Sequence, residues 1–131
     1  MTATLSKRPK RRTDVYAFKQ RVRGWADRIG VQPKELHIRT MTTKWASCST
    51  TGRVTFSADL LRESAGWQQY VIVHELLHLR IRNHGKLFKA VLSALLPDWE
   101  RTVQRQQARE PAGLGMAIAA SGRRRLKALP L

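Results

Sequence analysis

The sequence of 131 residues predicts one small α+β domain, and three observations support this prediction. Apolar residues recur at three- and four-residue steps over about 14–29, which is the period of a helix. The pattern then changes to alternation over 35–57, which is the period of a strand. Helical periodicity returns from about residue 67. A chain of 15.0 kDa leaves no room for a second domain of ordinary size.

The first predicted helix covers about residues 14–29. Its apolar side chains share one face of the helix, and they are Val15, Phe18, Val22, Trp25 and Ile29. Thr13 is suited to cap the start of this helix, because its hydroxyl can accept from a free backbone N–H group. Gly30 is suited to end it in a left-handed conformation.

Three strands and a short helical turn are predicted next. Apolar and polar residues alternate over 36–41, and residues 45–49 resemble a second strand. The sequence Ser-Thr-Thr-Gly at 49–52 indicates a turn, so a third strand is expected over 53–57. Residues 58–63 are expected to form a short helix or turn.

The second half of the domain is expected to be helical. Residues 67–82 are apolar on nearly every side, which is typical of a central buried helix, and residues 83–85 interrupt it. An amphipathic helix that stops before Pro97 follows, with these side chains facing inward: Leu87, Phe88, Val91, Leu92 and Leu95. A last helix over about 98–110 carries a basic stripe formed by Arg101, Arg105 and Arg109.

The charge of the chain is strongly positive and is concentrated at its ends. Lys and Arg number 25 and Asp and Glu nine, so the formal net charge is +16. Residues 7–12 hold five basic side chains and residues 123–127 hold four more. We therefore expect basic flexible arms at 1–12 and 111–131 around a domain at 13–110. The arms are expected either to bind nucleic-acid phosphates without sequence preference or to be merely solvated.

The remaining composition excludes several classes of protein. Cys48 is the only cysteine, so an intramolecular disulfide framework and an all-cysteine metal site are excluded. No apolar stretch reaches membrane-spanning length, and no apolar segment of a secretory signal follows the basic start. A cytoplasmic protein is the expectation, and no oligomeric state is predicted.

One motif dominates the sequence: His74-Glu75-Leu76-Leu77-His78, an H-E-x-x-H on a predicted helix. The two histidines are four residues apart, so both imidazoles lie on one face and can reach one metal ion. Glu75 lies about 100° round the helix from His74 and can act on the attacking water without binding the metal. Two ordinary core histidines are the alternative, but burying an unpaired glutamate between them would be costly.

A catalytic zinc needs a third protein ligand, and two residues are candidates. On a straight helix His84 would lie about 240° round and some 9 Å beyond His78, so it can bind only if the chain turns back near residues 82–85. Asn83 and Gly85 are residue types that favour such a turn. We therefore prefer His84 over Glu100, which is better explained as an acidic residue at a helix N-terminus.

These motifs together resemble a known family. Residues 44–49, 54–56, 70–79, 83–84 and 96–99 are similar to the YgjP-like metallopeptidase domain, a zincin that is itself similar to SprT-like and membrane-associated zinc endopeptidase-like proteases. The resemblance covers roughly residues 36–100. It implies a minimal zincin domain in which His74, His78 and His84 bind Zn²⁺ and Glu75 is the general base.

The expected function is zinc-dependent hydrolysis of peptide bonds in a peptide or protein substrate that lies along an exposed strand edge. Two alternatives remain. One is a metal-dependent nucleotide pyrophosphatase, an activity also described for this family, and the other is a basic nucleic-acid-associated module with structural zinc. A structural site would have no use for Glu75. The group that stabilises the oxyanion is left open between an arginine, Tyr70 and a backbone amide.

Three further side chains near the motifs are interpreted as structural. Trp45 is expected in the core and Cys48 as a small buried side chain, because a thiolate as fourth ligand would close the metal site. His37 is expected to be an ordinary surface or core histidine. The sequence predicts no substrate-binding residues.

Overall fold

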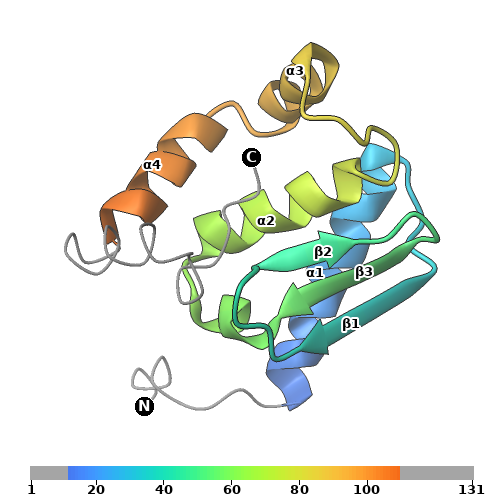
Figure 1. The fold of residues 1–131 in the computed structure, drawn as a ribbon. Coiled ribbons are helices and arrows are strands. Elements are labelled where there is room, and N and C mark those ends of the chain that lie inside the picture. Colours follow the sequence, from blue (N-terminus) through green and yellow to red (C-terminus); the bar gives the residue numbers. More distant parts are fainter. Residues whose placement is uncertain (1–11, 110–131) are drawn as a thin grey trace.

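The computed structural model describes residues 12–109, and their α+β architecture confirms the predicted fold class (Figure 1). The basic arms predicted at the two ends lie almost wholly outside these residues. The elements follow in this order: α1 (Arg12–Ile29), β1 (Glu35–Arg39), β2 (Ala46–Cys48), β3 (Arg53–Ser57), the 3-10 helix η2 (Ala58–Arg62), α2 (Ala65–Leu77), α3 (Lys86–Leu95) and α4 (Trp99–Arg109).

The three strands form a small mixed sheet in the order β1-β3-β2. β3 is central, pairing parallel to β1 and antiparallel to β2. Its apolar side chains Val54 and Phe56 are fully buried in the hydrophobic core. Within the described residues β2 is an edge strand that pairs only with β3. Helix α2 runs beside β2 (Figure 1).

Helix α1 lies behind the sheet and packs against it and against α2 (Figure 1). The rings of Phe18 on α1 and Phe56 on β3 meet edge to face, with centroids 5.2 Å apart. Gly30 ends α1 at a φ of 84°, as the sequence predicts. The predicted cap at Thr13 is wrong, because the helix already begins at Arg12 and Thr13 lies within its first turn.

Helix α2 is the centre of the molecule, and it ends five residues earlier than the periodicity predicts. The side chain of Ser64 caps its start by accepting from the backbone N–H of Trp67. After Leu77 the backbone changes to tight turns, in which the N–H groups of residues 78–80 bond three residues back. The apolar pattern continues through Ile81, but Arg80 and Arg82 bond to other parts of the fold and the chain leaves the helix.

Helices α3 and α4 cover the side of α2 away from the sheet (Figure 1). Phe88 and Leu92 are buried as predicted, whereas Leu87 is 65% exposed and the inward position predicted for it is wrong. A helix that packs mainly on one partner buries a narrow stripe, and Leu87 lies outside it. On α4 the buried residues are Trp99, Val103 and Gln106.

Two polar contacts hold α4 in place. The indole N–H of Trp99 donates to the hydroxyl of Ser93 on α3 at 2.9 Å. The side-chain amide of Gln106 donates to the carboxylate of Glu63, which precedes α2, at 3.3 Å. No helix within residues 12–109 combines the length and apolar character needed to cross a membrane.

Candidate metal centre

Three histidines converge at the end of α2. His74 lies on its last turns, His78 follows directly, and His84 comes from the loop before α3; their possible ligand nitrogens all lie within 4.8 Å of one another. The Nε2 atoms of His78 and His84 are 2.9 Å apart. Two nitrogens bound tetrahedrally to zinc at about 2.0–2.1 Å lie roughly 3.3 Å apart, so the three side chains fit one such ion.

The early end of α2 is what brings His84 back to the other two histidines. The chain turns at residues 78–80, directly after the helix, and bends again at Asn83 and Gly85, within the predicted region 82–85. Gly85 bends the chain at a φ of −84°, so this bend does not use the left-handed conformation that glycine permits. The early turn and the two later bends together bring the imidazole of His84 beside those of His74 and His78.

His74 has an unpaired nitrogen buried within the group. Its side chain is 2% exposed, and its Nδ1 donates to the Glu75 carboxylate at 3.2 Å. Its Nε2 is buried and has no hydrogen-bond partner in the described part of the chain. A buried polar atom without a partner is costly, and a metal ion bound to Nε2 would remove that cost.

His78 is held in the orientation that a metal ligand needs. Its Nδ1 donates to the backbone carbonyl of Ile81 at 3.1 Å, which leaves the lone pair of Nε2 facing His84. Burial and the neighbouring His74 lower the pKa of His78, and burial also lowers the pKa of His84. Both rings therefore favour the neutral form, which is the form that binds metals.

The two glutamates singled out from the sequence occupy different places. Glu75 is 5% exposed and contacts His74 within the group. Glu100 lies in the first turn of α4, as predicted, and lines a neighbouring cavity. Within residues 12–109 the one group able to hold a metal consists of the three histidines, and Glu100 is outside it.

Phe88 supports all three imidazoles. Its ring centroid lies 5.1, 4.9 and 5.0 Å from those of His74, His78 and His84. The sequence predicts Phe88 as an inward core residue of α3, but this supporting role was missed. Helix spacing does not predict this contact, because His84 lies in the loop before α3 and Phe88 lies in the first turn of that helix.

Arg82 connects the metal site to the edge strand and was also missed. It donates to the carbonyl of His78 at 2.8 Å and to the carbonyl of Cys48 on β2 at 3.4 Å. No pattern in the sequence predicts this contact, because it joins residues 34 positions apart. Cys48 is half-buried instead of fully buried as predicted, and burial raises the pKa of its thiol, which favours the neutral form.

Of the other residues discussed from the sequence, Trp45 and His37 have structural contacts, and Tyr70 lies close to the histidines. Trp45 is 6% exposed and belongs to the core, as predicted. His37 bonds to Glu35 at 2.8 Å on the far strand β1. Tyr70 lies in α2 one turn before His74, with ring centroids 5.7 Å apart. Burial and then the charge of Glu75 raise the pKa of Tyr70, so its hydroxyl keeps its proton.

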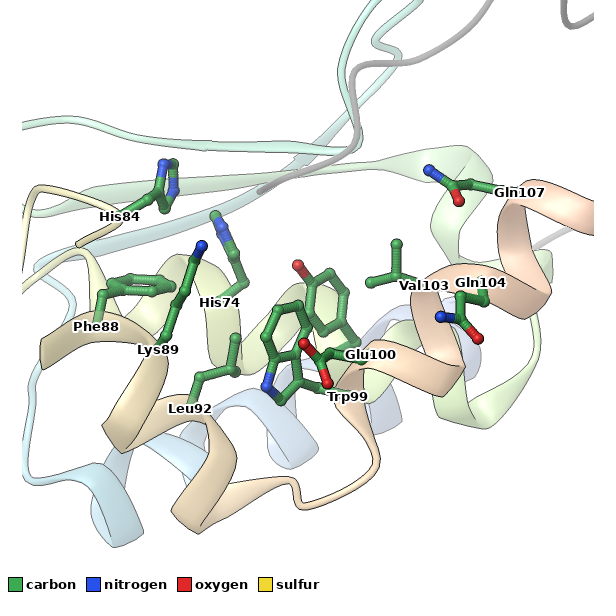
Figure 2. A pocket seen from close by; sticks show the side chains of 11 residues that line it. His74, His84, Phe88, Lys89, Leu92, Trp99, Glu100, Val103, Gln104 and Gln107 are labelled. Atoms are coloured by element: carbon green, nitrogen blue, oxygen red, sulfur yellow. The ribbon is translucent and has the colours of Figure 1, made fainter. Parts of the chain in front are cut away.

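A cavity of about 520 Å³ opens directly beside His74 and His84 (Figure 2). It lies between α2, α3 and α4, so the histidines form one end of an open recess instead of a closed cage. An enclosed group of ligands is typical of structural zinc sites, whereas catalytic sites keep access for water and substrate.

Comparison with known proteins agrees with this geometry. The chain resembles the crystal structure of the metallopeptidase zymogen abylysin of Pyrococcus abyssi, with 20% identity, a TM-score of 0.63, and coverage of 71% of this chain and 94% of that one. For the metallopeptidase zymogen jannalysin of Methanocaldococcus jannaschii the corresponding values are 21%, 0.60, 68% and 95%. At these identities the likeness establishes the fold.

The family assignment comes from the sequence match. No curated protein matches the chain in sequence. The model of the YgjP-like metallopeptidase domain matches residues 4–108, which extends beyond the region 36–100 that carries the resemblance in the motifs. The protein therefore belongs to the YgjP-like metallopeptidase family.

Proposed function

We propose that this metallopeptidase is zinc-dependent, with His74, His78 and His84 as metal ligands and Glu75 as general base. The observation that carries the proposal is the convergence of three imidazoles, with the buried Nε2 of His74 lacking a hydrogen-bond partner among residues 12–109. A set of imidazole donors suits zinc better than magnesium or calcium, which prefer oxygen ligands. Zinc bound there would polarise the scissile carbonyl and lower the pKa of the attacking water.

Glu75 has the position and surroundings that a general base needs. Its carboxylate is almost fully buried, lies beside His74 and exerts its charge on His78 and Tyr70. In the proposed reaction it accepts a proton from the attacking water and passes it to the leaving amine. Tyr70, whose hydroxyl stays protonated, is the donor that we favour for the negative charge developing on the carbonyl oxygen.

The edge strand β2 is the proposed platform for the substrate backbone. Its residues Ala46–Cys48 are half-buried, and the strand runs beside α2 at one end of the sheet order. An extended peptide that pairs with an edge strand gains main-chain hydrogen bonds without demanding a particular sequence. Arg82 holds this strand to the carbonyl of His78, which keeps the platform at a fixed distance from the histidines.

The pyrophosphatase alternative is less well supported. Pyrophosphate hydrolysis usually relies on Mg²⁺ or Mn²⁺ held by clustered carboxylates. Within the described residues the possible metal ligands that converge are histidines. A purely structural zinc is also disfavoured, because the recess beside His74 and His84 is open and the buried Glu75 contacts His74.

The proposed function is tested by measuring metal content and hydrolysis together. The purified protein is expected to hold one zinc ion per chain and to cleave unfolded protein substrates. A chelator should stop cleavage and zinc should restore it. Robust release of pyrophosphate from nucleoside triphosphates, lost in Glu75→Gln and accompanied by no cleavage of unfolded protein, would instead establish the pyrophosphatase.

The basic ends support a second, separate proposal about partners. Residues 7–12 and 123–127 hold nine of the 25 basic side chains, and we propose that they bind nucleic acid through phosphate contacts. Removing residues 1–11 and 123–131 should weaken binding to DNA and RNA and flatten its dependence on salt. Unchanged affinity and salt dependence would show that the ends are simply solvated.

A further inference from the structure

The cavity beside the histidines has a floor made of apolar side chains from three helices. Tyr70 lies on α2, Phe88 and Leu92 on α3, and Trp99 and Val103 on α4. Each is at most 9% exposed, so these residues are fixed in the core and present only their cavity-facing atoms. Figure 2 shows the floor residues of α3 and α4 facing one another across the recess.

The floor is rigid because its aromatic members are held on several sides. The rings of Tyr70 and Trp99 are stacked, with centroids 6.1 Å apart and planes at 13°, and Tyr70 also stacks on Trp67. Trp99 is additionally fixed by its hydrogen bond to Ser93. A recess with fixed walls binds a matching side chain without first ordering its own residues, which favours selectivity.

Charged and polar side chains occur at the rim instead of on the floor. Lys89 and Glu100 are exposed and of opposite sign, and the exposed Gln104 and Gln107 complete the α4 side (Figure 2). A charged substrate side chain placed on the floor would lose hydration, and because Lys89 and Glu100 have opposite signs, the lining favours neither a basic nor an acidic side chain. The chemistry of the recess therefore disfavours Lys, Arg, Asp and Glu and favours large apolar side chains.

We propose that this cavity is the specificity pocket of the peptidase and selects a large apolar residue, such as Leu or Phe, next to the scissile bond. The inference rests on the proposed function, since the pocket begins at His74 and His84. Its volume of about 520 Å³ exceeds what one aromatic side chain requires. Burying such a side chain in place of Ala is expected to raise kcat/KM roughly 10- to 100-fold.

The first experiment separates this inference from the proposed function. Cleavage sites are mapped by mass spectrometry in a mixture of denatured proteins, with Glu75→Gln as the control. Peptides that differ only at the preferred position, carrying Ala, Leu, Phe, Lys or Asp, are then compared in kcat/KM. Cleavage that depends on Glu75 but shows no preference for Leu or Phe would overturn the pocket while leaving the peptidase intact.

Binding provides a second measurement that does not need turnover. The affinity of Glu75→Gln for fluorescent Leu, Phe and Ala peptides is measured by anisotropy. Tighter binding of the Leu and Phe peptides by about 10-fold supports the pocket even if no cleavage is found, which would contradict only the proposed function. Equal affinity for all peptides overturns the pocket.

A pair of matched variants localises the effect. Gln104 is exposed at the rim of the cavity, and Gln69 is exposed on α2 away from it, so Gln→Phe at either position leaves the core intact. Gln104→Phe should narrow the opening and lower kcat/KM for the Phe peptide about 10-fold relative to the Ala peptide, whereas Gln69→Phe should change neither. The same result for both variants would place the selecting pocket elsewhere.

Discussion

The two sides of the recess beside the histidines are built in different ways. The metal segment, residues 74–84, brings all three histidines and Glu75 together within eleven consecutive positions. The cavity wall, formed by α3 and α4, holds no possible metal ligand of that group and is positioned by contacts with α2 and Glu63. The candidate metal ligands are therefore local in sequence, whereas the cavity that we propose for substrate selection depends on how distant helices pack.

The strongest test of the metal segment removes the third histidine. His84→Ala is expected to lower zinc affinity roughly 10³-fold, because one of three ligands is lost, and zinc content should fall from one ion per chain to almost none. Metal analysis after dialysis measures this directly. Glu100→Ala is the control and should keep its zinc; retention by His84→Ala or loss by Glu100→Ala would reassign the third ligand.

The next largest effect concerns the base of the metal segment. Glu75→Gln is expected to lower kcat about 10²- to 10⁴-fold, because an amide cannot accept the proton from water. The substitution preserves the shape of the side chain, so zinc content and thermal unfolding should stay close to wild type. Equal activity of the variant would show that another group is the base.

Substitutions in the cavity wall should change the free energy of unfolding and leave the metal content unchanged. Leu92→Ala removes a side chain that is 2% exposed and should lower the free energy of unfolding by about 2–5 kcal/mol. Leu87→Ala, on the same helix but 65% exposed, should change it by less than about 0.5 kcal/mol. Chemical denaturation measures both, and similar losses would mean that α3 packs through a different face.

A smaller effect on zinc affinity is expected from Arg82, which joins the metal segment to strand β2. Arg82→Ala should lower zinc affinity about 10-fold, because the carbonyl of His78 and the strand β2 lose their common partner. Arg82→Lys should recover only part of this loss, since an ammonium group cannot copy the planar fork of the guanidinium. Competition with a chromophoric chelator measures the change, and unaltered affinity in Arg82→Ala would remove this role.

Short-range rules predicted much of the fold. The bounds of β3 and the end of α1 at Gly30 agree with the turn residues and the apolar alternation beside them. The predicted end of α2 at residue 82 was wrong, because Leu79 and Ile81 continue the helical pattern in the sequence. The contacts that follow the true end join the chain to distant segments. Arg80 reaches the last turn of α1, and no local pattern carries that information.

The candidate site divides in the same way. The paired spacing of His74 and His78 predicts their common face from helix geometry alone. The proximity of His84 was predicted only conditionally, because it depends on where the chain leaves α2. The cavity was not predicted, because its lining residues lie up to 37 positions apart in the sequence. Taken one at a time, its apolar lining residues have the pattern of ordinary core side chains.

The two arginines that follow α2 have a further consequence for how the protein gains and loses its metal. Arg80 donates to the carbonyl of Ile29 at 3.2 Å, and Arg82 bonds to His78 and Cys48, so the loop between His78 and His84 is anchored to α1 and to β2. Fixing a free backbone costs about 1–2 kcal/mol per residue in conformational entropy. In this loop the contacts of Arg80 and Arg82 offset that cost before any metal binds. Metal binding then does not have to fold the loop, and the protein should pass through repeated cycles of metal removal and reloading without unfolding.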